Sequence, residues 1–298
     1  MIYQKDYIQI SSNKQEFPNA GQQNLVDFAA YNGNIHDSVV PDYIPAHWHH
    51  ELEFFYLEEG TVDVTVEGEV FHLHAKEGCL INSGALHSFY ATSPERCMFH
   101  SIVFHASVIS GATGSIFDRK YVRPFTDFGP PQIIFYQNSE SAALLELFQH
   151  AYDACQKDYD GFELDVRASL SKIIYYAKNL QPIQTKPLRI PESRIKTMME
   201  YVDTHYQEAL TVSNISQSAN ICTRECQRLF QKYLRCRPME YVCRKRILSA
   251  AAMLTDTDMQ IIEIADLCGF ASHSYFSEQF RKLIGKSPSD YRTNKKKP

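Results

Sequence analysis

Residues 261–292 read IIEIADLCGFASHSYFSEQFRKLIGKSPSDYR, and they give the clearest structural signal in this 298-residue chain. Their apolar residues recur at spacings of three and four, which is the pattern of short amphipathic helices. Gly269 interrupts this pattern, and glycine accepts the positive φ that a sharp turn between two helices requires. The stretch therefore predicts a helix, a tight turn and a second helix.

The same pattern occurs earlier in the chain, in VSNISQSANICTRECQRLFQKYLRCRPMEYV at residues 212–242. Before the turn the two copies align at an offset of 49, which places Asn220 on Gly269. After the turn the offset is 50, which places Phe230 on Phe280, so the second turn holds one extra residue. We interpret this self-similarity as an internal duplication.

A helix, a tight turn and a second helix form the helix-turn-helix unit, whose second helix enters the DNA major groove. Good helix formers fill the segment between the copies, PMEYVCRKRILSAAAMLTD at 238–256. A helix of about 17 residues spans roughly 26 Å, and successive major grooves on one side of DNA lie ~34 Å apart. The segment therefore predicts a strut that holds two DNA-recognition units about one turn apart.

The charge distribution agrees with a polyanion as the partner of this part of the chain. From Lys186 onward there are 19 Lys and Arg against 12 Asp and Glu, whereas the preceding residues hold 11 against 23. An acidic body joined to a basic C-terminal part indicates that only the latter meets DNA.

At this point the chain resembles the AraC family of transcriptional regulators, over residues 190–293. Nearly every position of 261–292 matches that family's second helix-turn-helix. The first copy departs from it: Ser216, Asn220 and Cys222 stand where Ala, Gly and Ser are usual, and Arg235 replaces a helix-ending Gly.

The resemblance also implies which side chains face DNA. Arg can bridge guanine O6 and N7, Gln can bridge adenine N6 and N7, and Glu can accept from cytosine N4. Cations and hydroxyls elsewhere on the helices suit phosphate contacts, and for any single residue a merely solvated helix face is the alternative. The groove-facing residues would be Thr223, Arg224, Gln227 and Arg228 in the first copy and His273, Ser274, Ser277 and Glu278 in the second, with Lys232, Ser272, Arg281 and Lys282 on phosphates.

The chain before about residue 135 differs from this helical part. Short segments such as TVDVTVEG, at 61–68, alternate apolar and polar residues, and glycines separate them at regular intervals. Many short strands with regular turns predict a β-sandwich or barrel.

Within this part, HWHHELEFFYLEEG at 47–60 resembles the first motif of the cupin barrels. The resemblance implies a ligand set of His47, His49 and Glu53, with His87 from the second motif as the fourth member. Strand alternation would place the first three on one face of a strand, and three imidazoles with a carboxylate suit Fe, Mn, Zn or Ni.

Three roles remain open for this cup. A metal-free cup that binds a sugar or a small acid is our first expectation, since sensing relatives bind organic effectors and Trp48 offers a ring for stacking. A divalent transition metal held by the same four residues is the second. Catalysis by such a metal, as in cupin enzymes, is the third, and we expect no enzyme and no obligatory cofactor.

Helical periodicity follows the barrel, and a stripe formed by Leu144, Leu147, Phe148 and Ala151 either covers the barrel or pairs with a second chain. No apolar run reaches the ~18 residues of a membrane helix, and no signal pattern opens the chain, so we expect a cytoplasmic protein.

Together these features predict an α+β multidomain protein, in which a cupin-type β-barrel and a helical pair precede an all-α domain. The expected function is that of a ligand-responsive transcriptional activator, with promoter DNA, a small effector, RNA polymerase and a second copy of the chain as partners. The expected parts are a ligand-sensing barrel at 1–138, a helical dimerisation segment at 139–180, a linker at 181–191 and a DNA-binding domain at 192–298 with motifs at about 212–234 and 261–284.

Overall fold

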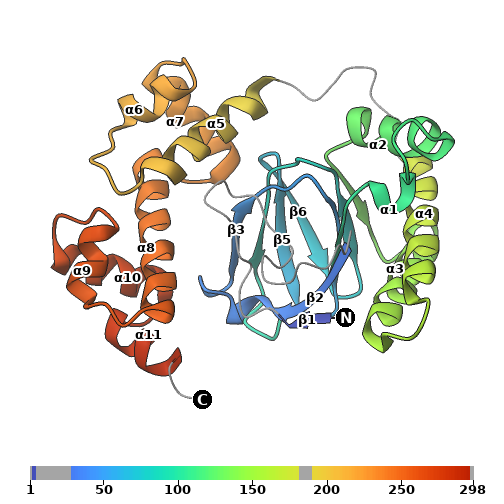
Figure 1. Ribbon diagram of the computed structural model, residues 1–298, viewed down its shortest axis with the longest axis horizontal. Helices are drawn as coiled ribbons and strands as arrows, with labels where there is room; N and C mark the ends of the chain where they lie inside the picture. Colours follow the sequence, from blue (N-terminus) through green and yellow to red (C-terminus); the bar gives the residue numbers. More distant parts are fainter. Residues whose placement is uncertain (1, 5–27, 181–189, 296–298) are drawn as a thin grey trace. The chain divides into compact units, whose positions relative to one another are not determined.

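The computed structural model describes residues 2–4, 28–180 and 190–295 (Figure 1). The chain divides into two compact units, and the main boundary between them lies after Arg189. Most of the expected linker, 181–189, lies outside the described residues, and its last two positions already belong to a helix of the second unit. Among the described helices, none combines the length and the apolar character needed to cross a bilayer.

Two β-sheets form the centre of the first unit. Neighbouring strands are antiparallel, except that β1 and β2 pair in parallel. The six-stranded sheet has the order β1 (Ile2–Gln4), β2 (Phe28–Asn34), β9 (Met98–Phe104), β4 (Leu52–Leu57), β7 (Gly78–Ile81) and β10 (Gln132–Phe135), and the four-stranded sheet has the order β3 (Tyr43–His47), β8 (His87–Ala91), β5 (Thr61–Val66) and β6 (Glu69–His74).

The alternation in TVDVTVEG has the predicted consequence, because Val62, Val64 and Val66 of β5 are all fully buried. They belong to an apolar cluster with members from both sheets. In this cluster Phe55 of β4 stacks on Phe89 of β8, with ring centroids 4.1 Å apart. The period of two thus builds the inner core between the sheets.

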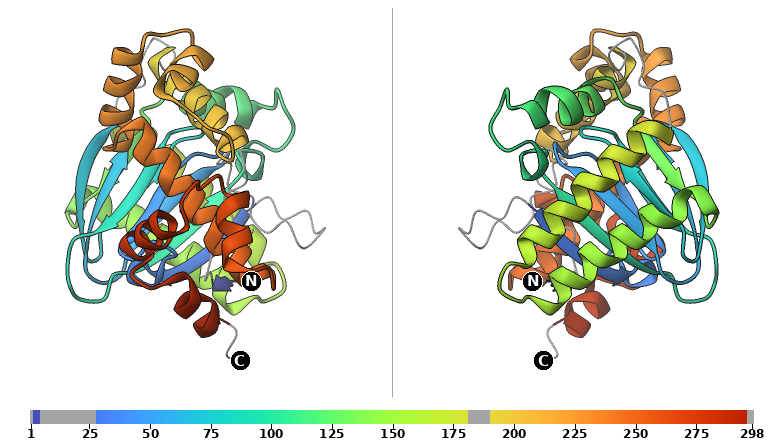
Figure 2. Two further views of the ribbon diagram at one scale, coloured as in Figure 1. Left: turned by 90° about the vertical axis from the view of Figure 1, so that its left-hand side faces the viewer. Right: turned by 90° about the vertical axis from the view of Figure 1, so that its right-hand side faces the viewer.

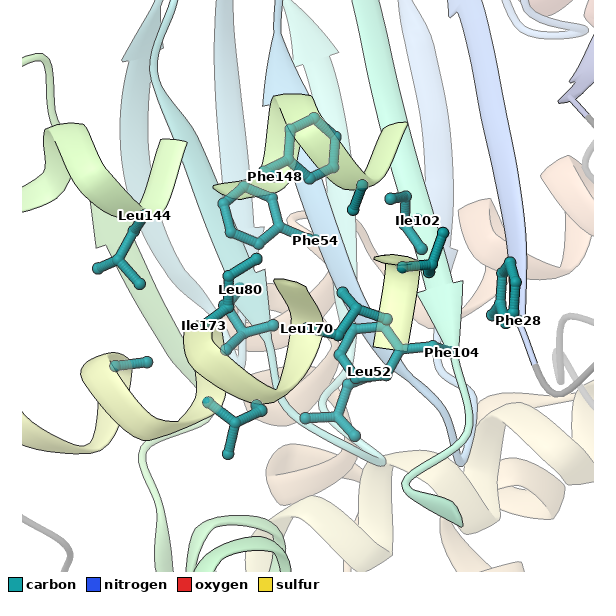
Figure 3. Close-up of a cluster of buried hydrophobic side chains, with 14 of the residues drawn as sticks. Phe28, Leu52, Phe54, Leu80, Ile102, Phe104, Leu144, Phe148, Leu170 and Ile173 are labelled. Carbon is teal, nitrogen blue, oxygen red and sulfur yellow. The ribbon is translucent and has the colours of Figure 1, made fainter. Parts of the chain in front are cut away.

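The two long helices of the first unit cover the outer face of the six-stranded sheet. Helices α3 and α4 lie side by side across it (Figure 2). Phe148 of α3 stacks on Phe54 of β4 at 4.4 Å between centroids, in a cluster that also holds Leu170 and Ile173 of α4 (Figure 3). The helical segments are η1 (Ile35–Asp37), α1 (Ser107–Ser110), η2 (Asp118–Val122), α2 (Arg123–Phe128), α3 (Ser139–Lys157) and α4 (Phe162–Leu180).

The apolar stripe of α3 covers the sheet and is therefore not free to pair with a second chain. Leu144, Phe148 and Ala151 are fully buried within the same chain, and Leu147 is partly buried beside them. Of the two alternatives for this stripe, the second is wrong. Any dimer contact by residues 139–180 must use another face.

Helices build the second unit, and both predicted pairs of short helices are present. The first pair is followed by α8 and the second by α11. Helix α8 joins the two pairs, as expected of the strut. The helices are α5 (Ile190–His205), α6 (Val212–Ser218), α7 (Thr223–Leu234), α8 (Pro238–Asp256), α9 (Ile261–Leu267), α10 (His273–Ile284) and α11 (Pro288–Lys295).

The duplication extends to the backbone conformation. Asn220 and its counterpart Gly269 both have positive φ, at 53° and 81°. The ends of α7 and α10 match in the same way, since Arg235 has φ 53° where Gly285 has 81°. Both copies therefore make the same turns, and the first copy makes them with residues other than glycine, at a cost of roughly 1 kcal/mol for a residue such as Arg235.

The segment that connects α5 to α6 joins the two halves of this unit. The guanidinium of Arg246, on α8, donates to the carbonyl oxygens of Tyr206 and Glu208, each at 2.7 Å. A Cβ placed on Gly269 would lie 2.5 Å from the carbonyl oxygen of Gln207. One short stretch of backbone thus contacts both α8 and the turn of the second helix-turn-helix.

Phe148→Ala tests the role of the α3 stripe. We expect a loss of about 3–5 kcal/mol in the free energy of unfolding, because the ring is fully buried and its removal leaves a cavity. Phe117→Ala, at the residue before η2, is the matched control: this phenylalanine is 53% exposed, so we expect a change within ~0.5 kcal/mol. Urea unfolding measures both, and a Phe148→Ala variant that unfolds like the wild type would contradict this packing.

Comparing Gly269→Ala with Gly285→Ala separates two costs of adding a side chain, the steric clash with a neighbouring backbone and the strain of a positive φ. Both glycines have φ 81°, but a Cβ at Gly285 meets no atom within 4 Å. We expect Gly285→Ala to lose about 1 kcal/mol and Gly269→Ala to lose at least twice as much. Equal losses of stability for the two variants in thermal unfolding would contradict a close approach between Gly269 and the Gln207 backbone.

Candidate metal centre and nucleic-acid interface

Folding brings all four predicted cup residues together between the two sheets. His47 ends β3 and pairs with His87 at the start of β8, both in the four-stranded sheet. Glu53 lies on β4 of the six-stranded sheet, and His49 lies in the connection between β3 and β4. The expectation that one strand carries the first three residues is wrong, because β3 ends at His47 and the chain turns before Glu53.

One ligand atom from each of these residues lies within 4.8 Å of the others, and all four side chains are buried. The imidazole rings are close neighbours, with centroids 4.2 Å apart for His47 and His87 and 5.1 Å apart for His49 and His87. The cluster is thus compact and shielded from bulk water.

Backbone carbonyls fix how each ring is turned. The Nδ1 atom of His47 lies 2.7 Å from the carbonyl oxygen of Pro45, and that of His87 lies 2.8 Å from that of Ala85. The Nδ1 atom of His49 lies 3.0 Å from the carbonyl oxygen of Glu51. Because a carbonyl oxygen only accepts, each Nδ1 carries the proton, and in a neutral ring each Nε2 then presents a lone pair.

The lone pairs of His49 and His87 face the carboxylate of Glu53. The Nε2 atoms of His49 and His87 lie 3.3 and 3.2 Å from its Oε2 atom. The other oxygen, Oε1, accepts a 2.7 Å hydrogen bond from the Ser101 hydroxyl of β9. An ionised carboxylate also presents only lone pairs, so the groups repel one another unless a cation, either protons on the rings or a metal ion, lies among them.

The pKa values have the same physical origin. Burial and the positive charge of the neighbouring imidazoles hold the pKa of His47 well below its ordinary value. Burial alone would raise the pKa of Glu53, but when His49 and His87 carry a proton on Nε2 as well, their hydrogen bonds to the carboxylate outweigh burial and hold this pKa well below its ordinary value. The carboxylate is therefore ionised at neutral pH, and the imidazole of His47 is uncharged.

The donor set fits a divalent transition metal. Imidazole nitrogens and a carboxylate oxygen are the usual ligands of Zn, Fe, Mn and Ni. Ligand atoms about 2.0–2.1 Å from a tetrahedral metal lie ~3.3 Å from one another, close to the two distances to Glu53 Oε2. In each ring the Nδ1–H also donates a hydrogen bond to a backbone carbonyl, which is the arrangement that orients metal-binding histidines.

The binding of a sugar or a small acid without metal, our first expectation for this cup, stays a prediction. Trp48 is buried as well, and its predicted part in ligand binding stays a prediction. His50, His72 and His74 are exposed and do not belong to this cluster.

The second unit presents every predicted DNA-facing side chain to solvent, on α7 and α10. The opposite sides of these helices are buried, with Leu229 and Phe230 on α7 and Phe276 and Phe280 on α10. Each helix therefore has one packed and one polar side. The exposed residues are Thr223, Arg224, Gln227, Arg228 and Lys232 on the first helix and Ser272, His273, Ser274, Ser277, Glu278, Arg281 and Lys282 at the second.

Some of these residues have partners that sequence reasoning missed. The Ser272 hydroxyl caps α10 by accepting from the Tyr275 backbone N–H. Arg228 is paired with Glu225, and His273 with Asp266. An acidic residue three positions before Arg228 was a usable signal for the first pair, and strand register alone would not have identified Ser101 as the partner of Glu53.

Two family models match the chain. An AraC-like ligand binding domain matches residues 38–173, and a helix-turn-helix domain matches residues 215–294. The first model thus matches most of the first unit, and the second matches the part of the second unit that holds both helix-turn-helix motifs.

Curated relatives agree with these matches. The chain is 24% identical over 270 residues to the HTH-type transcriptional regulator YdeC of Bacillus subtilis, a match that spans 89% of this chain and 91% of that protein. It is 24% identical over 266 residues to the melibiose operon regulatory protein of Escherichia coli, over 83% of each. It is also 31% identical over 134 residues to the HTH-type transcriptional regulator GbdR of Pseudomonas aeruginosa, over 43% of this chain and 36% of that one. These relatives are transcriptional regulators, and neither family model is that of an enzyme.

Proposed function

We propose that this chain, which belongs to the AraC family of transcriptional regulators, binds promoter DNA through α7 and α10 and changes that binding when a divalent transition metal occupies the cup. The duplicated helix-turn-helix, with a polar exposed side on each second helix, supports the first part. The lone pairs that converge on Glu53 support the second.

The DNA-binding part of the proposal rests on how α8 spaces the two motifs. This helix has 19 residues, so it is about 28 Å long at 1.5 Å per residue. Such a strut suits two recognition helices in successive major grooves, ~34 Å apart on one side of the duplex. Arg224 and Arg228 on α7 would contact guanines or phosphates, and Gln227 between them an adenine.

The ligand part rests on what a cation would do in the cup. A bound divalent ion supplies the positive charge that the three Nε2 atoms and the carboxylate lack. His47 and His87 come from one sheet and Glu53 from the other, so a shared ion would tie the two sheets together. The sheet that carries Glu53 also carries α3 and α4 on its outer face. Regulation requires that the ion bind the DNA-competent and the incompetent forms with different affinities.

We further propose a cytoplasmic homodimer that recruits RNA polymerase as an activator. The outer face of α4 is a suitable dimer contact, since Leu164, Tyr175 and Tyr176 are exposed there. Its first turn is acidic, with Glu163 and Asp165, and its last turn holds Lys178. Two antiparallel copies of α4 would therefore pair opposite charges.

Metal content tests the cup. For protein purified without chelators or an affinity-metal column, we expect about one equivalent of a single transition metal by mass spectrometry. His87→Ala should lose it, because one of four ligands is removed. His74→Ala is the matched control, since this exposed histidine lies outside the cluster. Equal metal content in wild type and His87→Ala would contradict the assignment.

Arg228→Ala tests the recognition helix. We expect operator binding to weaken by about 1–3 kcal/mol and sequence choice to relax at one position. Gel-shift titrations on an operator selected from a random duplex library measure the effect. Arg244→Ala on α8 serves as the control for loss of one positive charge. Equal losses on operator and random DNA would reduce Arg228 to a phosphate contact.

A further inference from the structure

A carboxylate holds the guanidinium of Arg228 on the exposed side of α7. The Nε and Nη2 atoms of Arg228 donate to the two carboxylate oxygens of Glu225, at 2.8 and 2.7 Å. Both bonds run in parallel, which is the bidentate geometry that fixes the plane of an arginine as well as its position. The side chain of Arg228 remains 58% exposed.

In the second motif a carboxylate also contacts a predicted base-facing side chain, through a single contact. The Nε2 atom of His273, at the start of α10, lies 2.8 Å from the Oδ1 atom of Asp266 on α9. Residues 225 and 266 do not correspond in the duplication, because an offset of 49 or 50 would place the counterpart of Glu225 at 274 or 275. The two carboxylates therefore do not descend from one duplicated position, although each contacts a predicted base-facing side chain.

We propose that Glu225 and Asp266 are positioning residues, which fix how Arg228 and His273 meet the bases. They thereby raise discrimination between DNA sequences and weaken binding to random DNA. This inference rests on the DNA-binding function proposed for these helices. Neither carboxylate needs to touch DNA. Each acts through the side chain that it orients.

The geometry leaves Arg228 able to recognise a base. A guanidinium has five N–H donors, and the bonds to Glu225 use one on Nε and one on Nη2. Three donors remain, and one on Nη1 and one on Nη2 point along the same free edge, where they form the pair that can bridge guanine O6 and N7. Glu225 therefore orients this edge and does not block it.

Two effects of opposite sign follow. An oriented arginine loses less conformational freedom when it meets its base, so the correct sequence gains. A carboxylate beside the DNA repels phosphates on every sequence, so binding to random DNA becomes weaker. The Arg228–Glu225 pair thus increases discrimination in two ways, by strengthening binding to the correct sequence and by weakening binding to other sequences.

Glu225→Gln in the full-length protein tests the proposal. A random duplex library selected with the wild type supplies the preferred sequence, and the single-base variant at the position of Arg228 supplies its competitor. We expect binding to random DNA to strengthen several-fold and discrimination between the two duplexes to fall by about five-fold or more. Glu225→Asp, which keeps the charge, should retain part of that discrimination.

Controls separate this role from stability and from charge alone. Glu240→Gln removes a carboxylate that pairs with Arg244 on α8, outside the recognition helices, and should leave base discrimination unchanged. Thermal unfolding checks that the variants remain folded. Asp266→Asn should relax discrimination at a different base, the one that His273 meets.

The outcomes are distinct. A wild-type protein that selects no sequence from the library would contradict the DNA-binding function itself. A wild type that selects a sequence, with Glu225→Gln keeping its full discrimination, would contradict the positioning role alone.

Discussion

Electrostatic repulsion inside the barrel is the constraint around which the first unit is organised. Three imidazoles and the Glu53 carboxylate converge from two sheets, and carbonyl oxygens hold every Nδ1 so that the Nε2 atoms face inward. Buried groups that present only lone pairs to one another are stable only with a cation among them. The inner core, the bond from Ser101 and the register of the strands all maintain this arrangement.

The arrangement of the second unit depends on one backbone segment that contacts several of its helices. The connection between α5 and α6 accepts two hydrogen bonds from Arg246 and lies against Gly269. Beside it, Lys245 of α8 pairs with the buried carboxylate of Asp203 on α5, at 3.2 Å. Contacts of this kind hold the two recognition helices at a fixed spacing, which a protein needs if it is to bind two grooves at once.

Much of this could be predicted from the sequence because it is local. Helical periodicity and the turn residues predicted both motifs, and the structure has the expected positive φ at Asn220 and Gly269. The four cup residues were found because a motif preserves their spacing. The α3 stripe shows the limit of such reasoning, since periodicity identifies an apolar face but not what covers it. The partners Ser101 and Asp266 depend on side-chain geometry, which spacing alone does not determine, whereas the spacing of three between Glu225 and Arg228 was a usable signal.

The measurement that bears most directly on this account is operator affinity with the cup loaded and emptied. The same protein would be titrated against its selected operator after chelation and after addition of one equivalent of the metal found in it. The account predicts a change of about five-fold or more in the wild type and none in His49→Ala. Equal affinities for the loaded and the emptied wild type would contradict the coupling between the cup and DNA.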